Sequence, residues 1–151
     1  MIKLAHIAEH TEHIDLIAGW MCSEWGTDNN HAFFKSILVH STDKANLPQT
    51  IIALDGDRPV GVIGLWRCDM VSRQDLYPWL SGLYVVPEYR GQGLGAQLQT
   101  YLADYAKSLG YKELYLYTDI ENYYEKSGWE YIDNGITYSG EYDRIYKLTL
   151  G

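Results

Sequence analysis

Three glycines at alternate positions, Gly91, Gly93 and Gly95, form the segment of the sequence best suited to chemistry. They follow an apolar run that ends at Val86 and precede the apolar positions of a helix. Without side chains, the N–H groups that open a helix are accessible, and together with the helix dipole these unpaired donors attract an anion. Arg90, directly before the turn, adds a charge suited to a phosphate. The pattern therefore predicts a pyrophosphate site between a strand and a helix.

Other readings of this turn fit less well. A P-loop needs a Lys-Ser or Lys-Thr pair after its glycines, and the sequence has none there. The dinucleotide fingerprint is closer, since Gly91, Gly93 and Ala96 have its spacing and Asp119 stands where an acidic ribose partner would. However, residues 87–90 separate the strand from the first glycine, and too little sequence follows for a doubly wound sheet. A tight turn with no ligand explains one glycine better than three.

The elements that must hold this turn are predicted from hydrophobic periodicity. We expect strands near residues 2–6, 50–54, 60–66, 79–86, 114–117, 129–132 and 142–150, and helices near 14–25, 33–38, from Gly91 to Leu109 and at 121–126. The second and third strands form a hairpin, because residues 55–59 favour a sharp turn. Residues 79–117 form a strand-helix-strand unit, which predicts a parallel pair. The fold class is α+β, within one domain spanning residues 1–151.

Composition narrows the classes of partner. The 151 residues carry a formal net charge of −8, which argues against nucleic acid and favours a cationic or neutral substrate, although acidity also simply aids solubility. No apolar run approaches the length of a membrane span, and the amino terminus lacks a signal-peptide core. Cys22 and Cys68 have neither disulfide-framework nor metal-type spacing. We expect a cytoplasmic protein with no metal and no membrane or nucleic-acid partner; a homodimer is left open.

Two motifs resemble those of the GNAT superfamily of N-acetyltransferases. Residues 83–95, Leu-Tyr-Val-Val-Pro-Glu-Tyr-Arg-Gly-Gln-Gly-Leu-Gly, are similar to its motif A, in which a Val-x-Pro strand end precedes the Arg-x-x-Gly-x-Gly turn. Residues 123–129, Tyr-Tyr-Glu-Lys-Ser-Gly-Trp, resemble its motif B. The two motifs occur in the family's order, with the expected strands around them. The resemblance therefore extends over nearly the whole chain and implies a twisted mixed sheet with helices on both faces.

The resemblance also implies a cofactor and the residues that bind it. Acetyl-coenzyme A would be the co-substrate, without a metal. Main-chain groups of the strand before motif A would bond the pantetheine arm, the turn would take the pyrophosphate, and Val85 N–H would bond the acetyl carbonyl oxygen. The expected cofactor-binding residues are Leu83, Tyr84, Val85, Arg90, Gly91, Gln92, Gly93, Leu94 and Gly95. Tyr124 would be the catalytic acid that protonates the leaving thiolate; the alternative is a tyrosine that only packs against Trp129.

The sequence departs from the family at the general base. Relatives often carry a glutamate on the strand after the motif A helix, where this chain has Tyr117. A tyrosine with an ordinary pKa near 10 is a poor base at neutral pH. The segment between Tyr117 and Tyr124 is also shorter than usual, so that only Asn122 is a candidate for the family's asparagine. The base is therefore unassigned.

Acceptor specificity in this family comes mainly from the amino-terminal half. The expected substrate-binding residues are Asp69, Asp75 and Trp25. Either carboxylate could meet an ammonium or accept its proton through water; the alternative is two solvated loop residues, with Asp75 paired to Arg73. For Trp25 the alternative is a place in the core.

These expectations combine into one function and one rival. The function is N-acetyltransfer from acetyl-coenzyme A to a primary amine, small molecule or peptide, by direct attack in a ternary complex. The rival is a non-catalytic acyl-coenzyme A sensor, which the missing glutamate keeps open. Both bind coenzyme A, so only turnover separates them.

Overall fold

The computed structural model describes residues 1–151, and its seven strands form one mixed sheet in the order β1-β2-β3-β4-β5-β7-β6. The strands are β1 Ile2–His6, β2 Gln49–Asp55, β3 Arg58–Trp66, β4 Trp79–Val85, β5 Glu113–Thr118, β6 Glu130–Ile136 and β7 Tyr142–Thr149. The helices are α1 Ile14–Trp25, α2 His31–Val39 and α3 Leu94–Ser108, with 3-10 turns η1 Ile7–Glu9, η2 Thr11–His13, η3 Val71–Arg73, η4 Pro87–Tyr89 and η5 Tyr124–Ser127. Each predicted strand is present, within a few residues of its expected bounds.

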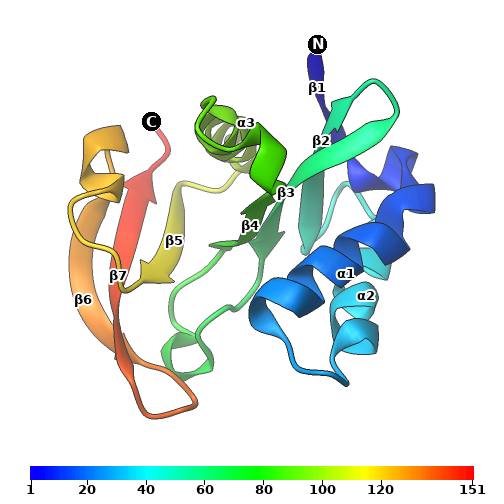
Figure 1. The fold of residues 1–151 in the computed structure, drawn as a ribbon. Coiled ribbons are helices and arrows are strands. Elements are labelled where there is room, and N and C mark those ends of the chain that lie inside the picture. Colours follow the sequence, from blue (N-terminus) through cyan, green and yellow to red (C-terminus); the bar gives the residue numbers. More distant parts are fainter.

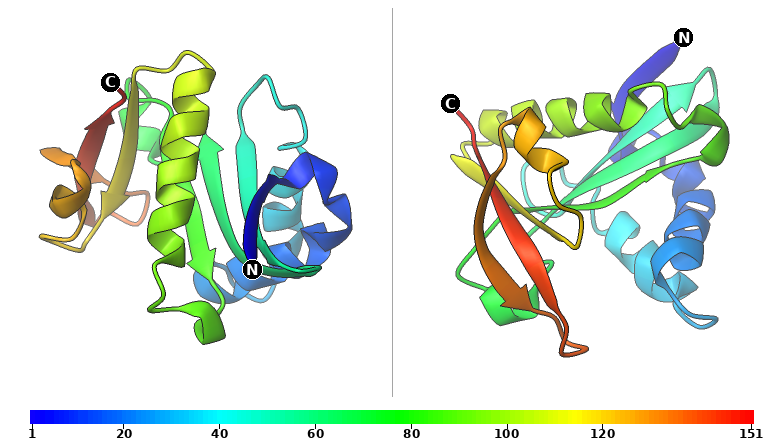
Figure 2. Two further views of the ribbon diagram at one scale, coloured as in Figure 1. Left: turned by 90° about the horizontal axis from the view of Figure 1, so that it is seen from above. Right: turned by 60° about the vertical axis from the view of Figure 1, so that its left-hand side comes forward.

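All neighbouring strands pair antiparallel except β4 and β5, which run parallel and are connected in the sequence through α3. The helix α3 covers one face of the sheet and the α1–α2 pair covers the other (Figures 1 and 2). The predicted α+β class, with a twisted mixed sheet and helices on both faces, is confirmed. None of the helices has the length and apolar character needed to cross a bilayer.

The helix α3 is held on the sheet by one apolar stripe. Leu94, Leu98, Leu102 and Ala106 recur every four residues and are all buried. Gly61 of β3 lies directly under this stripe, since a Cβ there would stand 3.1 Å from Leu98 Cδ1. Burying each leucine contributes about 1.5–3 kcal/mol. The start of α3, where the glycine turn lies, is therefore fixed relative to β3 and β4.

Two predicted helix boundaries are wrong. The helix expected from Gly91 begins at Leu94, because Gly91 and Gly93 have φ of 76° and 83°, which a right-handed helix does not allow. The helix expected at 121–126 is the shorter 3-10 turn η5, because Asn122 has φ of 61° and breaks the helix before Tyr124. In both cases the left-handed residue leaves the backbone exposed in a turn.

Candidate active site

The strands β4 and β5 form a fork beneath α3 (Figure 1). They share one paired position, Trp79 with Tyr115, and beyond it β4 separates from β5. The separation follows an irregularity in the β3–β4 register, where Gly82 adopts φ of 63°. A bulge of this kind bends and twists a strand, which turns the end of β4 away from β5.

The fork exposes main-chain groups of β4 that have no neighbouring strand. Tyr84 pairs with Val62 of β3, and Val86 N–H donates to Val60 O, so these residues point their polar groups at β3. Because successive residues of a strand alternate, Val85 and Leu83 point theirs at the fork. These are the groups expected to bond a pantetheine arm.

The glycine turn closes the end of the fork. Gly93 is the N-cap residue of α3, and no side chain caps the helix there. A Cβ added at Gly91, Gly93 or Gly95 would find no atom within 4 Å, so no other part of the chain crowds the turn. An uncapped helix start with three bare glycines fits a pyrophosphate.

The two polar side chains of the turn are engaged within the chain. Arg90 Nε donates to Val85 O at 2.8 Å, and its guanidinium lies 5.3 Å from the Tyr84 ring centre. Gln92 Nε2 donates to Glu88 O at 3.4 Å. Arg90 therefore braces the end of β4, and a phosphate contact from its side chain would require it to swing outward.

Tyr124 lies on the α3 side of the sheet, packed against the same core as Leu83 and Val85. Its ring contacts those of Tyr123, Trp129 and Tyr146, with centroid distances of 4.8, 6.1 and 6.0 Å. The Tyr146 hydroxyl accepts from Arg144 and donates to Glu125, whereas no residue of the chain engages the Tyr124 hydroxyl. Burial, together with Tyr123, raises the pKa of Tyr124 and keeps the hydroxyl protonated.

A cavity of about 470 Å³ opens on the opposite face of the sheet. It is lined by Asp69, Met70, Val71, Ser72, Tyr117, Ile136, Thr137, Tyr138 and Gly140. These residues come from the β3–β4 loop, the end of β5 and the β6–β7 turn. Tyr117 points into this face because its neighbour Leu116 packs under α3.

Asp69 is the charged group of this cavity. Burial raises the pKa of Asp69 to about 6, and only the nearby Ser81 hydroxyl opposes the shift. Burial and the Asp69 and Asp143 carboxylates raise the pKa of Tyr117 to about 12. Ser81 is 4% exposed, and its hydroxyl has no hydrogen bond of normal geometry. The site thus holds a carboxylate without a cationic partner and an unsatisfied hydroxyl beside it.

The other two predicted acceptor residues lie outside the cavity. Asp75 forms a two-bond pair with Arg73, at 3.0 and 2.9 Å, and Arg73 also contacts Asp133 of β6 at 3.1 Å. These contacts hold the β3–β4 loop against β6. Trp25 is 48% exposed and meets the Tyr84 ring edge-on at 6.5 Å, on the α1 side of β4.

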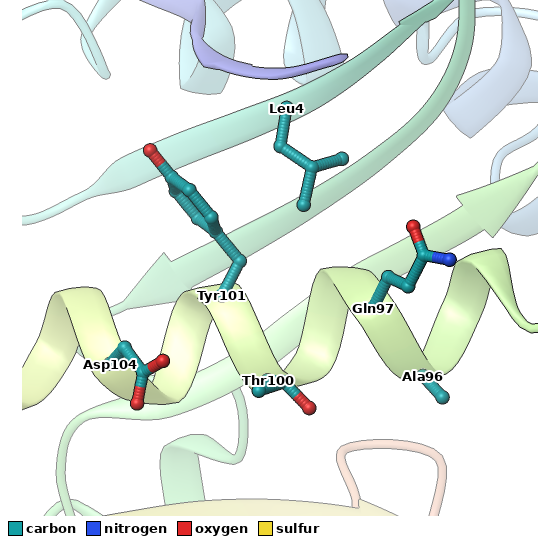
Figure 3. A pocket seen from close by; sticks show the side chains of 6 residues that line it. All are labelled: Leu4, Ala96, Gln97, Thr100, Tyr101 and Asp104. Carbon is teal, nitrogen blue, oxygen red and sulfur yellow. The ribbon is translucent and has the colours of Figure 1, made fainter. Parts of the chain in front are cut away.

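A second hollow of about 450 Å³ lies beside α3 and contains none of the predicted site residues (Figure 3). The side chains of Gln97 and Tyr101 point from the helix towards Leu4 of β1. Those of Ala96, Thr100 and Asp104 lie along the lower side of the helix in this view. It is a shallow groove between two elements, separate from the fork.

Two features of the site were not predicted. Ser81 could have been found from the sequence, because it is a polar residue within the apolar run Trp79 to Leu83. The alternation of side chains along a strand places it on the cavity face. The cavity wall at residues 136–140 carries no local signal, because the β6–β7 hairpin brings it to Asp69 from more than sixty residues away.

The fork, the uncapped glycine turn and the sheet order define an acyltransferase class of fold, and comparison identifies the family. The acetyltransferase (GNAT) family profile matches residues 14–129. The chain therefore belongs to the GNAT acetyltransferase family, as the resemblance of residues 83–95 and 123–129 implied.

Individual relatives agree with this assignment. N-alpha-acetyltransferase 30 of Schizosaccharomyces pombe is 32% identical over 106 residues, which cover 67% of this chain and 63% of that relative. An aminoglycoside 6'-N-acetyltransferase complexed with coenzyme A has a TM-score of 0.75 at 16% identity, over 99% of this chain and 97% of its own. The NatC complex bound to Gag peptide and CoA contains a chain with a TM-score of 0.73 at 19% identity, over 99% of each chain. At these identities the structural likeness establishes the fold.

Proposed function

We propose that this protein transfers the acetyl group of acetyl-coenzyme A to a primary amine by direct attack in a ternary complex. The observation that carries the proposal is the β4–β5 fork, whose β4 arm runs towards the uncapped glycine turn and whose β5 arm carries Tyr117 of the cavity on the other face of the sheet. When bound, acetyl-coenzyme A supplies an activated thioester. The fork lets a ligand at the turn and a ligand in the cavity meet from opposite faces.

Each part of the site has one task in this proposal. The N–H groups of Gly91 to Gly95 bind the pyrophosphate, with Leu94 supplying the first helical N–H and Arg90 and Gln92 shaping the turn. Main-chain groups of Leu83 and Val85 hold the pantetheine arm as an added strand would be held, whereas Tyr84, also expected there, is directed at β3 and does not take part. Tyr124, free and protonated, donates its proton to the departing sulfur.

The acceptor is a small molecule or a peptide with a free amine. An aminoglycoside acetyltransferase and a peptide-bound NatC subunit share this fold, and the sequence relative is an N-alpha-acetyltransferase. The net charge of −8 and the unpaired Asp69 favour an acceptor that carries positive charge.

The test is an amine screen that separates an enzyme from a sensor. Acetyl-coenzyme A is supplied with a diamine, an aminoglycoside or a short peptide with a free amino terminus, and release of thiol and formation of the amide are both measured. An enzyme releases thiol only with an amine, and initial rates at varied concentrations of both substrates give intersecting lines. Binding of coenzyme A with no amine-dependent release in any sample would favour the sensor instead.

A further inference from the structure

The cavity on the face of the sheet opposite α3 contains a carboxylate, that of Asp69, to which the proposed reaction assigns no catalytic role. Asp69 lies in the loop between β3 and β4, three residues after β3 ends. It lines the cavity together with Tyr117 of β5. The tyrosine cannot act as a base at neutral pH, because burial and two carboxylates hold its pKa near 12.

We propose that Asp69 is the general base of this enzyme and that the cavity around it receives the ammonium group of the acceptor. This inference rests on the proposed acetyl transfer and names the residue and the subsite that serve it.

The position of Asp69 fits this task. It lies close to Ser81 of β4, which stands just beyond the position where β4 and β5 last pair. The N–H groups of β4 that face the fork, those of Leu83 and Val85, are two and four residues beyond Ser81, about 7 and 13 Å at 3.3 Å per residue. An acceptor that enters past Asp69 therefore approaches the fork from the cavity side, and water between the amine and the carboxylate can carry the proton.

The electrostatics of the cavity also fit. No lysine or arginine is among the groups that shift the pKa of Asp69, so its carboxylate is available to an external cation. Asp143 lies close enough to raise the pKa of Tyr117, and its own pKa is raised by burial, Asp119 and Glu141. The field is negative, and an ammonium that enters the cavity replaces the missing counter-charge.

The protons balance in the resulting reaction. The acceptor arrives as an ammonium, which has no lone pair, and Asp69 takes one proton from it directly or through water. The nitrogen lone pair then forms the C–N bond while the C–S bond breaks, and the sulfur takes its proton from Tyr124. The second nitrogen proton restores Tyr124 through solvent, and Asp69 releases its proton to water. The net products are an amide, a thiol and one proton.

The first test measures Asp69 without any acetyl transfer. Carbon NMR of labelled aspartate carboxyls should show one group that titrates near pH 6 and is absent from Asp69→Asn. Adding butylammonium should lower that pKa, because a neighbouring cation favours the carboxylate, whereas the uncharged analogue butanol should not. A normal pKa for Asp69, or no response to butylammonium, would overturn the subsite. The groups that interact with Asp69 and must be considered with it are Cys68, Ser81 and Tyr117, and Asp143 acts on Tyr117.

The second test uses Asp69→Asn with Asp57→Asn as the matched control. Asp57 lies exposed in the β2–β3 turn, and its substitution removes the same charge far from the cavity. The Asp69 variant should lose about 10²-fold or more in kcat, the range of a lost general base, and should lose the rise in rate around pH 6. It should still bind coenzyme A as the native protein does.

The outcomes separate this inference from the function on which it rests. If the native protein acetylates an amine and Asp69→Asn does so at the same rate and with the same pH profile, Asp69 is not the base and the function stands. If the native protein acetylates no amine, the function fails, and the NMR titration still decides whether the cavity binds an ammonium.

Discussion

At the scale of single residues, the site depends on two groups with opposite tasks whose environments differ. Tyr124 is packed among three aromatic rings, and burial raises its pKa, so it keeps a proton to donate. As the C–S bond breaks, negative charge develops on the sulfur, and the Tyr124 hydroxyl donates its proton to the departing group, which leaves as a thiol with a pKa of about 8.5. The pair is matched to the departure of a thiol.

Replacing Tyr124 with phenylalanine should lower kcat by about 10²-fold, because the ring and its packing remain while the proton is lost. The affinity for acetyl-coenzyme A, measured by calorimetry, should stay within about twofold of the native value. Tyr123→Phe is the control, since Tyr123 is an exposed neighbour with the same ring. Equal turnover of Tyr124→Phe, under conditions where chemistry limits the rate, would make Tyr124 a packing residue.

The residue types were more predictable than their partners. The motif around residues 123–129 predicts Tyr124 as the acid, and the acceptor loop predicts Asp69 and Asp75 alike as substrate contacts. Which aspartate stays unpaired was not predictable, because Arg73 binds Asp75 through local geometry and Asp133 from sixty residues away. Contacts of that sequence separation depend on the packing of β6 against the loop.

At the scale of elements, the glycine turn and the β4–β5 fork arise from the same backbone feature. In both, a backbone segment with positive φ interrupts regular pairing and leaves polar groups unpaired: Gly82 opens the fork, and Gly91 and Gly93 uncap α3. Unpaired backbone groups are costly when buried, so at both segments a ligand that pairs with them would bind favourably.

Replacing Gly95 with valine tests the turn. Gly95 lies in the first turn of α3 with an ordinary φ, so a side chain fits its backbone and projects towards the phosphate site without strain. We expect affinity for coenzyme A to fall at least about tenfold by calorimetry, a loss of about 1.4 kcal/mol.

Gly19→Val is the matched control, because Gly19 is also a helical glycine with no atom within 4 Å of an added Cβ. It should bind coenzyme A normally. If Gly95→Val binds as tightly as this control does, the pyrophosphate lies elsewhere.

Most elements could be predicted because their apolar periodicity is strong, as along α3. The two wrong boundaries both lie beside left-handed residues, at Gly91 to Gly93 and at Asn122. Glycine and asparagine tolerate this conformation without requiring it, so the sequence alone does not reveal where a helix is delayed.

At the scale of the whole molecule, the proposed cofactor site and the proposed acceptor cavity lie on opposite faces of the sheet. The glycine turn and Tyr124 lie on the α3 side, and the cavity with Asp69 lies on the other side. The fork is the place where the two sides meet.

The cavity has a stability cost that can be measured. The folded pKa of Asp69, about 6, lies above its ordinary value of 3.8, so the folded state favours the protonated form. Its contribution is fully present below pH 3.8 and is lost as the pH rises through 6. Asp69→Asn should therefore be more stable than the native protein at pH 8, by about 1–2 kcal/mol after allowance for solvent screening, and equal to it near pH 4.

Urea unfolding of both proteins at the two pH values checks this prediction. The difference between native and variant isolates Asp69 from the other carboxylates, which titrate equally in both. An Asn variant that gains nothing between pH 4 and pH 8 would show that Asp69 is well solvated, and the cavity would then lack the charge assigned to it.

A single-turnover experiment tests the central claim of acetyl transfer within one ternary complex most directly. Protein in excess over acetyl-coenzyme A labelled in the acetyl group is mixed with an amine selected by the screen, and the label on amine, protein and coenzyme A is followed with time. Direct attack predicts that the label passes from coenzyme A to the amine and never appears on the protein. Label bound covalently to the protein before it reaches the amine, or label that stays on coenzyme A with every amine, would contradict the account.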